Sequence, residues 1–184
     1  MPQAVAHILV PLVLVSLFRD YLVKKRIKKN KKKFPLIYAL IAGLAGIIPD
    51  LDIAAFWILY FFEFTFEGVH RTFMHTLFIP LIFILLASIF YNLKNPKYLE
   101  KNKLKLWIIF LMISLGSFIH LILDATFQGT INPLYPILDF RIGLNLLRYL
   151  PDTLERLAAP SIDAALLIIW LVYLEWKHKI SSFI

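Results

Sequence analysis

The chain contains no cysteine, which excludes disulfide bonds and thiolate ligands. Any metal site must therefore use histidine, aspartate or glutamate. Histidine is scarce as well, with five in 184 residues. The N-terminus has neither a basic segment ahead of its first apolar run nor a small-residue cleavage pattern, so we expect a retained helix rather than a signal peptide. The sequence shows no internal repeat.

Charged residues are also few. They make up 17% of the chain against 60% hydrophobic residues, and the mean hydropathy is +0.73. This apolar share is well above that of a soluble domain. Several apolar runs approach 20 residues, the length of a helix that crosses a bilayer. Composition and length together predict a single integral membrane domain over residues 1–184.

The apolar runs predict an all-α fold, a multi-pass membrane bundle of about five helices. The five segments cover residues 4–23, 35–62, 73–91, 106–127 and 161–176. Pro49 is expected to kink or end the second helix, and residues 53–66 either complete that span or lie at the interface. Small residues at 39, 42, 43 and 46 predict close helix contact. The stretch from Leu144 to Leu157 has apolar spacing suited to a helical loop in the interface.

Lysine is missing from half of the connecting segments, which predicts the topology. The net charge of +8 first suggests nucleic acid, but every lysine falls in residues 24–33, residues 92–105 or the C-terminal tail. Such clustering between apolar runs is typical of cytoplasmic loops, so the expected partners are membrane lipids and not nucleic acid. Residues 63–72, the 128–160 loop and the N-terminus are then outside, and the C-terminus is cytoplasmic. The cell membrane is the predicted location, and the oligomeric state stays open.

Polar residues inside the apolar segments share one predicted depth. At about 1.5 Å per helical residue, Asp50 lies roughly 22 Å from the inner interface, His120 and Asp163 roughly 21 Å, and His7 roughly 18 Å. The hydrocarbon core is about 30 Å thick, which places them all in the outer leaflet. Ionisable residues at such a depth are costly and mark functional sites.

The remaining polar residues extend this set. His120 and Asp124 are four apart and share a helix face, and His70 and His75 flank the outer start of the third segment. Four histidines with Asp50, Asp52, Asp124 and Asp163 form a mixed nitrogen and oxygen ligand set. Such a set suits Zn²⁺, Mn²⁺ or Fe²⁺. We assign no role to His178 in the basic tail.

Each member also has a simpler interpretation. His120 and Asp124 can make a hydrogen bond between helices, and Asp50 with Asp52 can cap a helix end. His7 can be an interfacial histidine, and Asp163 can lie in the first turn of its helix. Arg71 can anchor the interface or hold a phosphate oxygen. The shared level of the whole set favours a common site.

The order of these motifs resembles the YdjM family of membrane-bound, metal-dependent hydrolases. The motifs are His7, Gly46-Ile-Ile-Pro-Asp-Leu-Asp52, His70-Arg-Thr-Phe-Met-His-Thr76 and Gly116-Ser-Phe-Ile-His120-Leu-Ile-Leu-Asp124, within about residues 4–136. The pattern is more distantly similar to zinc-dependent phospholipase C. That likeness implies that His7, Asp50, His70, His120 and Asp124 bind zinc, with His75, Asp52 or Asp163 completing the shell. Because no histidine lies between His120 and His178, one or two ions are expected rather than three.

These observations predict a membrane-embedded, metal-dependent hydrolase, a phospholipase C-like phosphoesterase. Its site at the extracytoplasmic leaflet implies a lipid or lipid-linked phosphate substrate. A divalent metal, zinc or else manganese or iron, would activate water. Asp52 or Asp124 would accept its proton, and Arg71 would neutralise the phosphoryl oxygens. The alternatives are a proton- or ion-coupled transporter and a structural membrane protein with polar packing residues.

Overall fold

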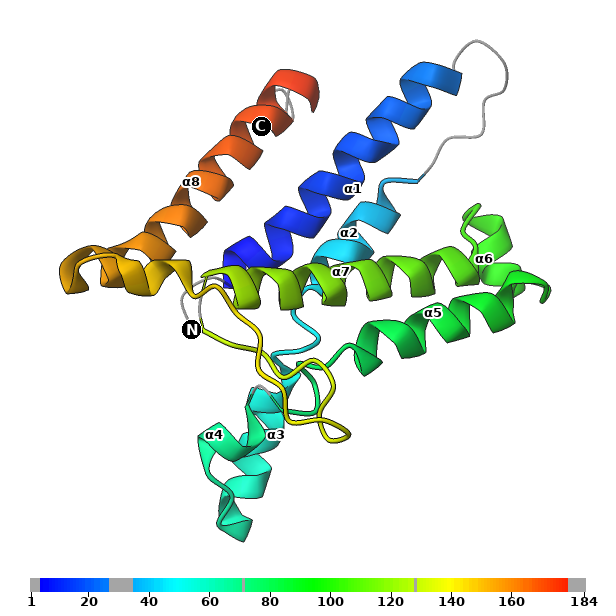
Figure 1. Cartoon of the computed structure of the whole chain (residues 1–184). Helices are drawn as coiled ribbons and strands as arrows, with labels where there is room; N and C mark the ends of the chain where they lie inside the picture. The colour runs from blue at the N-terminus through cyan, green and yellow to red at the C-terminus, as the bar shows by residue number, and fades with distance from the viewer. Residues whose placement is uncertain (1–3, 27–34, 71, 128, 179–184) are drawn as a thin grey trace.

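The computed structural model describes residues 4–26, 35–70, 72–127 and 129–178, and it confirms an all-helical fold (Figure 1). The described residues form α1 (Ala4–Arg26), α2 (Ile37–Ala45), α3 (Leu51–Leu59), α4 (Phe66–Val69), α5 (Phe78–Tyr91), α6 (Lys97–Lys101), α7 (Leu106–Phe127) and α8 (Asp152–His178). Short 3-10 helices cover Tyr60–Phe62 (η1) and Leu146–Tyr149 (η2). The one β-bridge in this part of the chain pairs Ile131 with Ile142.

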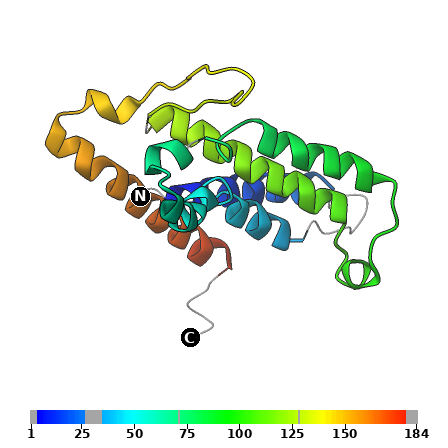
Figure 2. The same ribbon diagram turned by 90° about the horizontal axis from the view of Figure 1, so that it is seen from below.

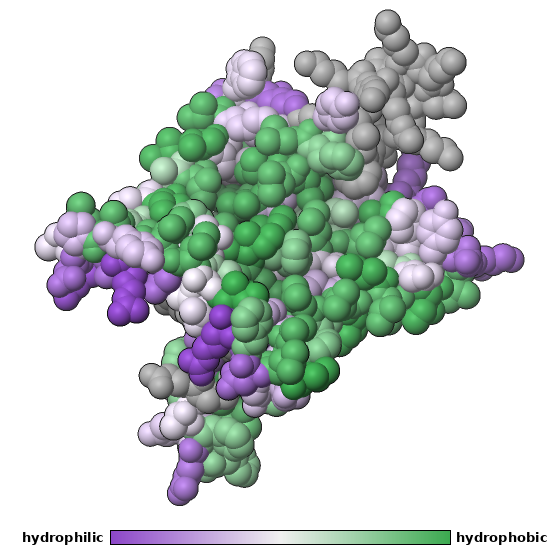
Figure 3. Space-filling view, in the orientation of Figure 1, coloured by the Kyte–Doolittle hydropathy of each residue, from purple (hydrophilic) through white to green (hydrophobic). Residues whose placement is uncertain are grey.

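Helix α7 lies at the centre of the bundle. Helix α5 runs beside it, as Figures 1 and 2 both show, and α2 packs against α7 and α1. Helix α8 packs mainly on α1. Two helices, Leu106–Phe127 and Asp152–Lys177, are long and apolar enough to cross a membrane. Figure 3 shows apolar residues over this face of the bundle, with hydrophilic residues gathered toward its ends.

Glycines bring α1, α2 and α7 into close contact, as the small residues predicted. A Cβ on Gly43 would lie 2.9 Å from the Cβ of Leu12 in α1. A Cβ on Gly46 would collide with the carbonyl oxygen of His7, and one on Gly116 would collide with that of Ala42. Only glycine permits these approaches, and they place the first turn of α1 and the middle of α7 beside the end of α2.

The apolar segment over residues 35–62 forms two helices, which confirms the expectation that Pro49 kinks or ends the second helix. Helix α2 ends at Ala45, and tight turns follow in which Ile48 donates to Ala45 and Asp50 donates to Ile47 at 3.1 and 3.0 Å. Pro49 has no backbone N–H and so cannot continue the α-helical ladder. Helix α3 then leaves the bundle and packs mainly on η1 and α4 (Figure 1). We call residues 51–69 the aromatic arm.

The C-terminal helix differs from prediction. The expected helix start at Ser161 is wrong, because α8 is continuous from Asp152, with Pro160 inside it. The amides of Leu154 and Glu155 donate to the carbonyl of Pro151 at 2.8 and 2.9 Å, which begins the helix there. Asp152 and Glu155 stabilise its first turn through the helix dipole. The stretch from Leu144 to Leu157 is thus partly helical, as η2 and the first turns of α8, but it is not one separate helix.

Candidate metal centre

Seven predicted ligands meet where the bundle helices join the base of the aromatic arm. They come from the first turns of α1 and α3, the turn before α3, the end of α4, the turn before α5, and α7. They are His7, Asp50, Asp52, His70, His75, His120 and Asp124. The side chains of His75 and His120 are 0% exposed. Because α5 begins at Phe78 and not Phe73, His75 lies in a turn that points it into the cluster.

The two fully buried histidines form the centre of the cluster. The Nε2 atoms of His75 and His120 are 3.2 Å apart. An oxygen of Asp50 lies 3.6 and 3.7 Å from these two atoms. An oxygen of Asp124 lies 3.4 and 3.7 Å from them. Ligand atoms on one tetrahedral Zn²⁺ lie about 3.3 to 3.6 Å apart, from metal–ligand distances of about 2.0 to 2.2 Å.

The other ring nitrogens determine which atoms face this centre. His120 Nδ1 is 2.6 Å from the carbonyl oxygen of Gly46, which can only accept, so Nδ1 carries the proton and donates. Nε2 of His120 then presents a lone pair toward the corresponding nitrogen of His75. Two facing lone pairs are unfavourable unless a proton or a metal ion lies between them.

Asp52 orients two further rings. One of its oxygens lies 3.0 Å from His70 Nδ1, and the other lies 3.0 Å from His75 Nδ1. A carboxylate in this position fixes the ring and makes the opposite nitrogen a better metal ligand. His70 Nε2 is buried and has no hydrogen-bond partner among the described residues. These facts fit a metal site, and they favour an orienting role for Asp52 over a ligand or base role.

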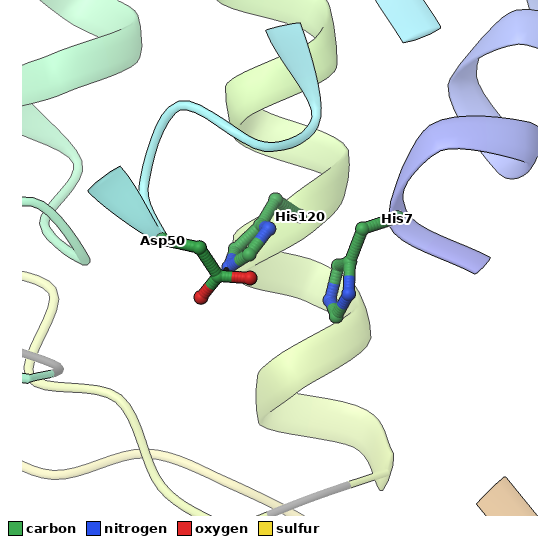
Figure 4. A group of neighbouring side chains, drawn as sticks. All are labelled: His7, Asp50 and His120. Atoms are coloured by element: carbon green, nitrogen blue, oxygen red, sulfur yellow. Dashed lines mark ion pairs between the residues drawn. The ribbon is translucent and has the colours of Figure 1, made fainter. Parts of the chain in front are cut away.

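His7 extends the cluster on the side of α1. Figure 4 shows His7 pointing from the end of α1 toward His120 on α7, with Asp50 coming from the turn before α3. The His7 and His120 ring centroids are 4.0 Å apart, and His7 Nε2 lies 3.2 Å from an oxygen of Asp124. Three overlapping groups have ligand atoms within 4.8 Å of one another. The groups are His7, Asp50 and His120; Asp50, His70 and His75; and His75, His120 and Asp124.

The carboxylates make the centre attractive to positive charge. Burial alone lowers the pKa of the His75 imidazole, but hydrogen bonds to Asp124, Asp50 and Asp52 raise that pKa to about 10. His75 lies in a turn outside the apolar helices. The same carboxylates can hold a divalent cation in place of this proton, since a cation offsets the cost of bringing them together.

Two other residues that the sequence analysis assigned to the site, Arg71 and Asp163, are not among the seven clustered ligands described above. Arg71 lies outside the described residues. Asp163 lies well inside α8 and not in its first turn, and its carboxylate accepts the amide of Ala6 at 2.8 Å. It therefore anchors the start of α1 beside His7. Sequence reasoning missed the Gly46 carbonyl, because backbone acceptors leave no signal in residue types.

The fold and the cluster define a helical membrane protein with a buried histidine and aspartate centre able to hold a metal ion. The chain belongs to the YdjM inner membrane protein family, whose model matches residues 1–180. Searches of curated proteins and of solved structures each returned no match. Family membership thus confirms the resemblance to YdjM and the inner-membrane location.

Proposed function

We propose that this protein is a membrane-embedded, metal-dependent hydrolase. The observation that carries the proposal is the 3.2 Å separation of the His75 and His120 Nε2 atoms, with Asp50 and Asp124 at ligand spacing around them. A catalytic zinc takes three protein ligands and leaves its fourth position to water, so His75, His120 and Asp50 would hold it with Asp124 beside the open position; manganese or iron is the alternative. The overlapping groups allow one or two ions to share the cluster.

The proposed substrate is a phosphoester in a lipid or a lipid-linked molecule. The aromatic arm supports this choice, because it joins the cluster at both of its ends and exposes large apolar side chains. Trp57 is 69% exposed and Phe61 83% exposed. Such side chains suit an acyl chain or the membrane interface. The site is proposed to open to the extracytoplasmic leaflet.

Each residue of the cluster has its own proposed role in the hydrolysis. A bound metal ion supplies Lewis acidity and lowers the pKa of water to about 7. Asp50 and Asp124 provide negative charge for the cation, and Asp52 holds the rings of His70 and His75 in place. Asp124 is the proposed proton acceptor, because its carboxylate lies 3.2 Å from His7 Nε2 and 3.4 Å from His75 Nε2, beside the position proposed for the metal. Arg71 is proposed to neutralise charge on the phosphoryl oxygens.

The test is phosphate or phosphoalcohol release from lipid phosphoesters by purified protein in detergent. Wild type should hydrolyse at least one lipid phosphoester in a chelator-sensitive manner, whereas Asp50→Ala and His120→Ala should lose at least about 100-fold in rate while remaining folded. Asp152→Ala, at the exposed start of α8, is the matched control and should retain activity.

Other outcomes identify the alternatives. Uptake of a solute into proteoliposomes without hydrolysis would favour a transporter. Variants that unfold rather than losing activity, in a protein without hydrolytic activity, would favour a structural role. Either result contradicts the proposal.

A further inference from the structure

A second site lies away from the metal centre, between α1, α2 and α8. The structure contains a half-open groove of about 410 Å³ there, within the range of ligand pockets, which run from about 300 to 1,000 Å³. The groove shares no residue with the metal cluster. Its lining includes Leu12, Ser16, Arg19, Leu40, Trp170 and Tyr173.

The spacing of the lining residues explains the groove. Leu12, Ser16 and Arg19 are four and three residues apart and share one face of α1. Trp170 and Tyr173 are three apart on the facing side of α8. Helix α8 packs mainly on α1, and Leu40 of α2 lines the groove that lies between these helices.

One residue of the groove lining, Ser16, carries a buried hydroxyl. Ser16 is 3% exposed, and its Oγ has no hydrogen-bond partner within the described ranges. An unsatisfied hydroxyl is unfavourable in an apolar wall, because no water or backbone group replaces its lost hydration.

One cation lines the groove, and a second contacts a lining residue. Arg19 is the lining cation, on the part of α1 that leads into the basic segment 24–33. Tyr173 lines the groove from α8, and Lys177 Nζ donates to the Tyr173 hydroxyl at 3.2 Å and lies 5.3 Å from its ring centroid. Arginine and lysine together suit a phosphate beside an apolar groove.

We propose that this groove binds an acidic phospholipid, with an acyl chain against Leu12, Leu40 and Trp170 and the phosphate beside Arg19 and Lys177. The lipid fills the space between α8 and α2 and so holds α8 against the bundle. This binding site is independent of the metal centre and of hydrolysis.

Native mass spectrometry of the delipidated full-length protein tests the proposal, with phosphatidylglycerol and phosphatidylethanolamine as probes. Wild type should retain phosphatidylglycerol preferentially. Arg19→Gln should reduce that preference about fivefold, the effect of one cation worth about 1 kcal/mol near an anionic lipid. Leu40→Trp, which fills the groove, should reduce binding of both lipids.

Matched controls carry the same changes elsewhere. Lys101→Gln removes an exposed cation of α6, and Leu14→Trp adds bulk at an α1 position that is 50% exposed and outside the groove lining. Both should bind like wild type. Equal retention of the two lipids by wild type, or an unchanged preference in Arg19→Gln, would overturn the proposal.

A second measurement tests the proposal without the groove variants, in case those variants fail to fold. With Trp57, Trp107 and Trp176 replaced by phenylalanine, Trp170 reports from the groove wall. Brominated phosphatidylglycerol should quench its fluorescence more than brominated phosphatidylethanolamine at equal mole fraction in vesicles. Equal quenching by the two lipids would refute a site selective for acidic lipid.

Discussion

Asp52 contacts two imidazole rings at once, and this separates its role from that of Asp50. Its oxygens lie 3.0 Å from His70 Nδ1 and from His75 Nδ1, whereas an Asp50 oxygen lies 3.6 Å from His75 Nε2, on the metal-facing side. Asp50 is also more exposed, with 14% of its side chain accessible against 4% for Asp52. The two carboxylates of one short motif therefore have different surroundings, and under the proposed function Asp50 binds the metal while Asp52 orients the rings.

Replacing Asp52 with asparagine should lower metal affinity without abolishing binding. The amide offers only one oxygen acceptor, so at least one of the two rings loses its orienting carboxylate. We expect affinity for Zn²⁺ to fall about 10- to 100-fold, the usual cost of losing such a partner. Metal titration of purified protein measures this.

Asp50→Asn and Asp152→Asn provide the comparison. Asp50→Asn should lose binding even at high metal concentration, and Asp152→Asn should match wild type. If Asp52→Asn binds as tightly as wild type, the orienting role is wrong. If it loses binding as completely as Asp50→Asn, Asp52 is a ligand.

At the scale of single residues, most of the candidate site could be predicted from the sequence. Depth counting along separate segments brought His7, Asp50 and His120 to one level, and the structure places them together. What could not be predicted depends on backbone position. The Gly46 carbonyl that fixes the His120 ring and the Ala6 amide that binds Asp163 are recognisable only when the helices are packed.

At the scale of elements, Gly46 determines how α1 approaches the site. A side chain there would collide with the carbonyl of His7, and the Gly46 carbonyl itself accepts from His120. One residue thus positions two histidines. The sequence predicted the close contact, but it could not predict that the contact would fall beside the ligands.

Gly46→Ala should therefore lower both stability and metal binding. The Cβ must displace α1, which moves His7 and weakens the hydrogen bond to His120. We expect a cost of about 1–3 kcal/mol, as for overpacked interiors, seen as a lower melting temperature in detergent. Leu44→Ala, at a position 55% exposed, is the control and should have little effect. A fully stable Gly46→Ala with normal metal content would contradict this role.

The aromatic arm is the element whose direction the sequence left open. Residues 53–66 could have completed a span, but α3 instead leaves the bundle and packs mainly on η1 and α4 (Figure 1). The turn that starts at Gly46 decides this direction. Pro49 marks the position of this turn in the sequence, but the angle between α2 and α3 depends on how the helices pack.

Under the proposed function, serine at Phe61 and Phe62 should raise KM for a long-chain lipid substrate several-fold and leave kcat nearly unchanged. These side chains are 83% and 68% exposed, so the fold loses little packing when they are removed. Phe140→Ser, 55% exposed in the loop before α8, is the matched control. An unchanged KM in the double variant would exclude a role of the arm in lipid binding.

At the scale of the whole molecule, α1 and α8 run parallel. Asp163 of α8 binds the Ala6 amide near the start of α1, and Tyr173 lies across the groove from Arg19 farther along both helices. If both helices cross the membrane, their C-terminal ends share a side. The helix ends that lead into residues 24–33 and the C-terminal tail would then lie on one side, and the cytoplasmic assignment of that side stays a prediction.

The lack of cysteine makes that topology easy to measure, since a single introduced cysteine is the only thiol. A cysteine at Asp139 should react with a membrane-impermeant maleimide in intact cells or spheroplasts. A cysteine at Lys101 should react only after permeabilisation, because it lies in the lysine-rich segment 92–105, which is predicted to be cytoplasmic. The unmodified protein should not be labelled. The reverse pattern would place the metal centre toward the cytoplasm.

Metal content tests the central claim most directly. We predict that protein purified without added metal or chelator contains about one or two equivalents of a divalent metal, most of it zinc. His120→Ala should lose this metal, and His178→Ala, the matched change in the basic tail, should retain it. Metal-free wild-type protein that also fails to bind Zn²⁺, Mn²⁺ or Fe²⁺ on titration would contradict the account.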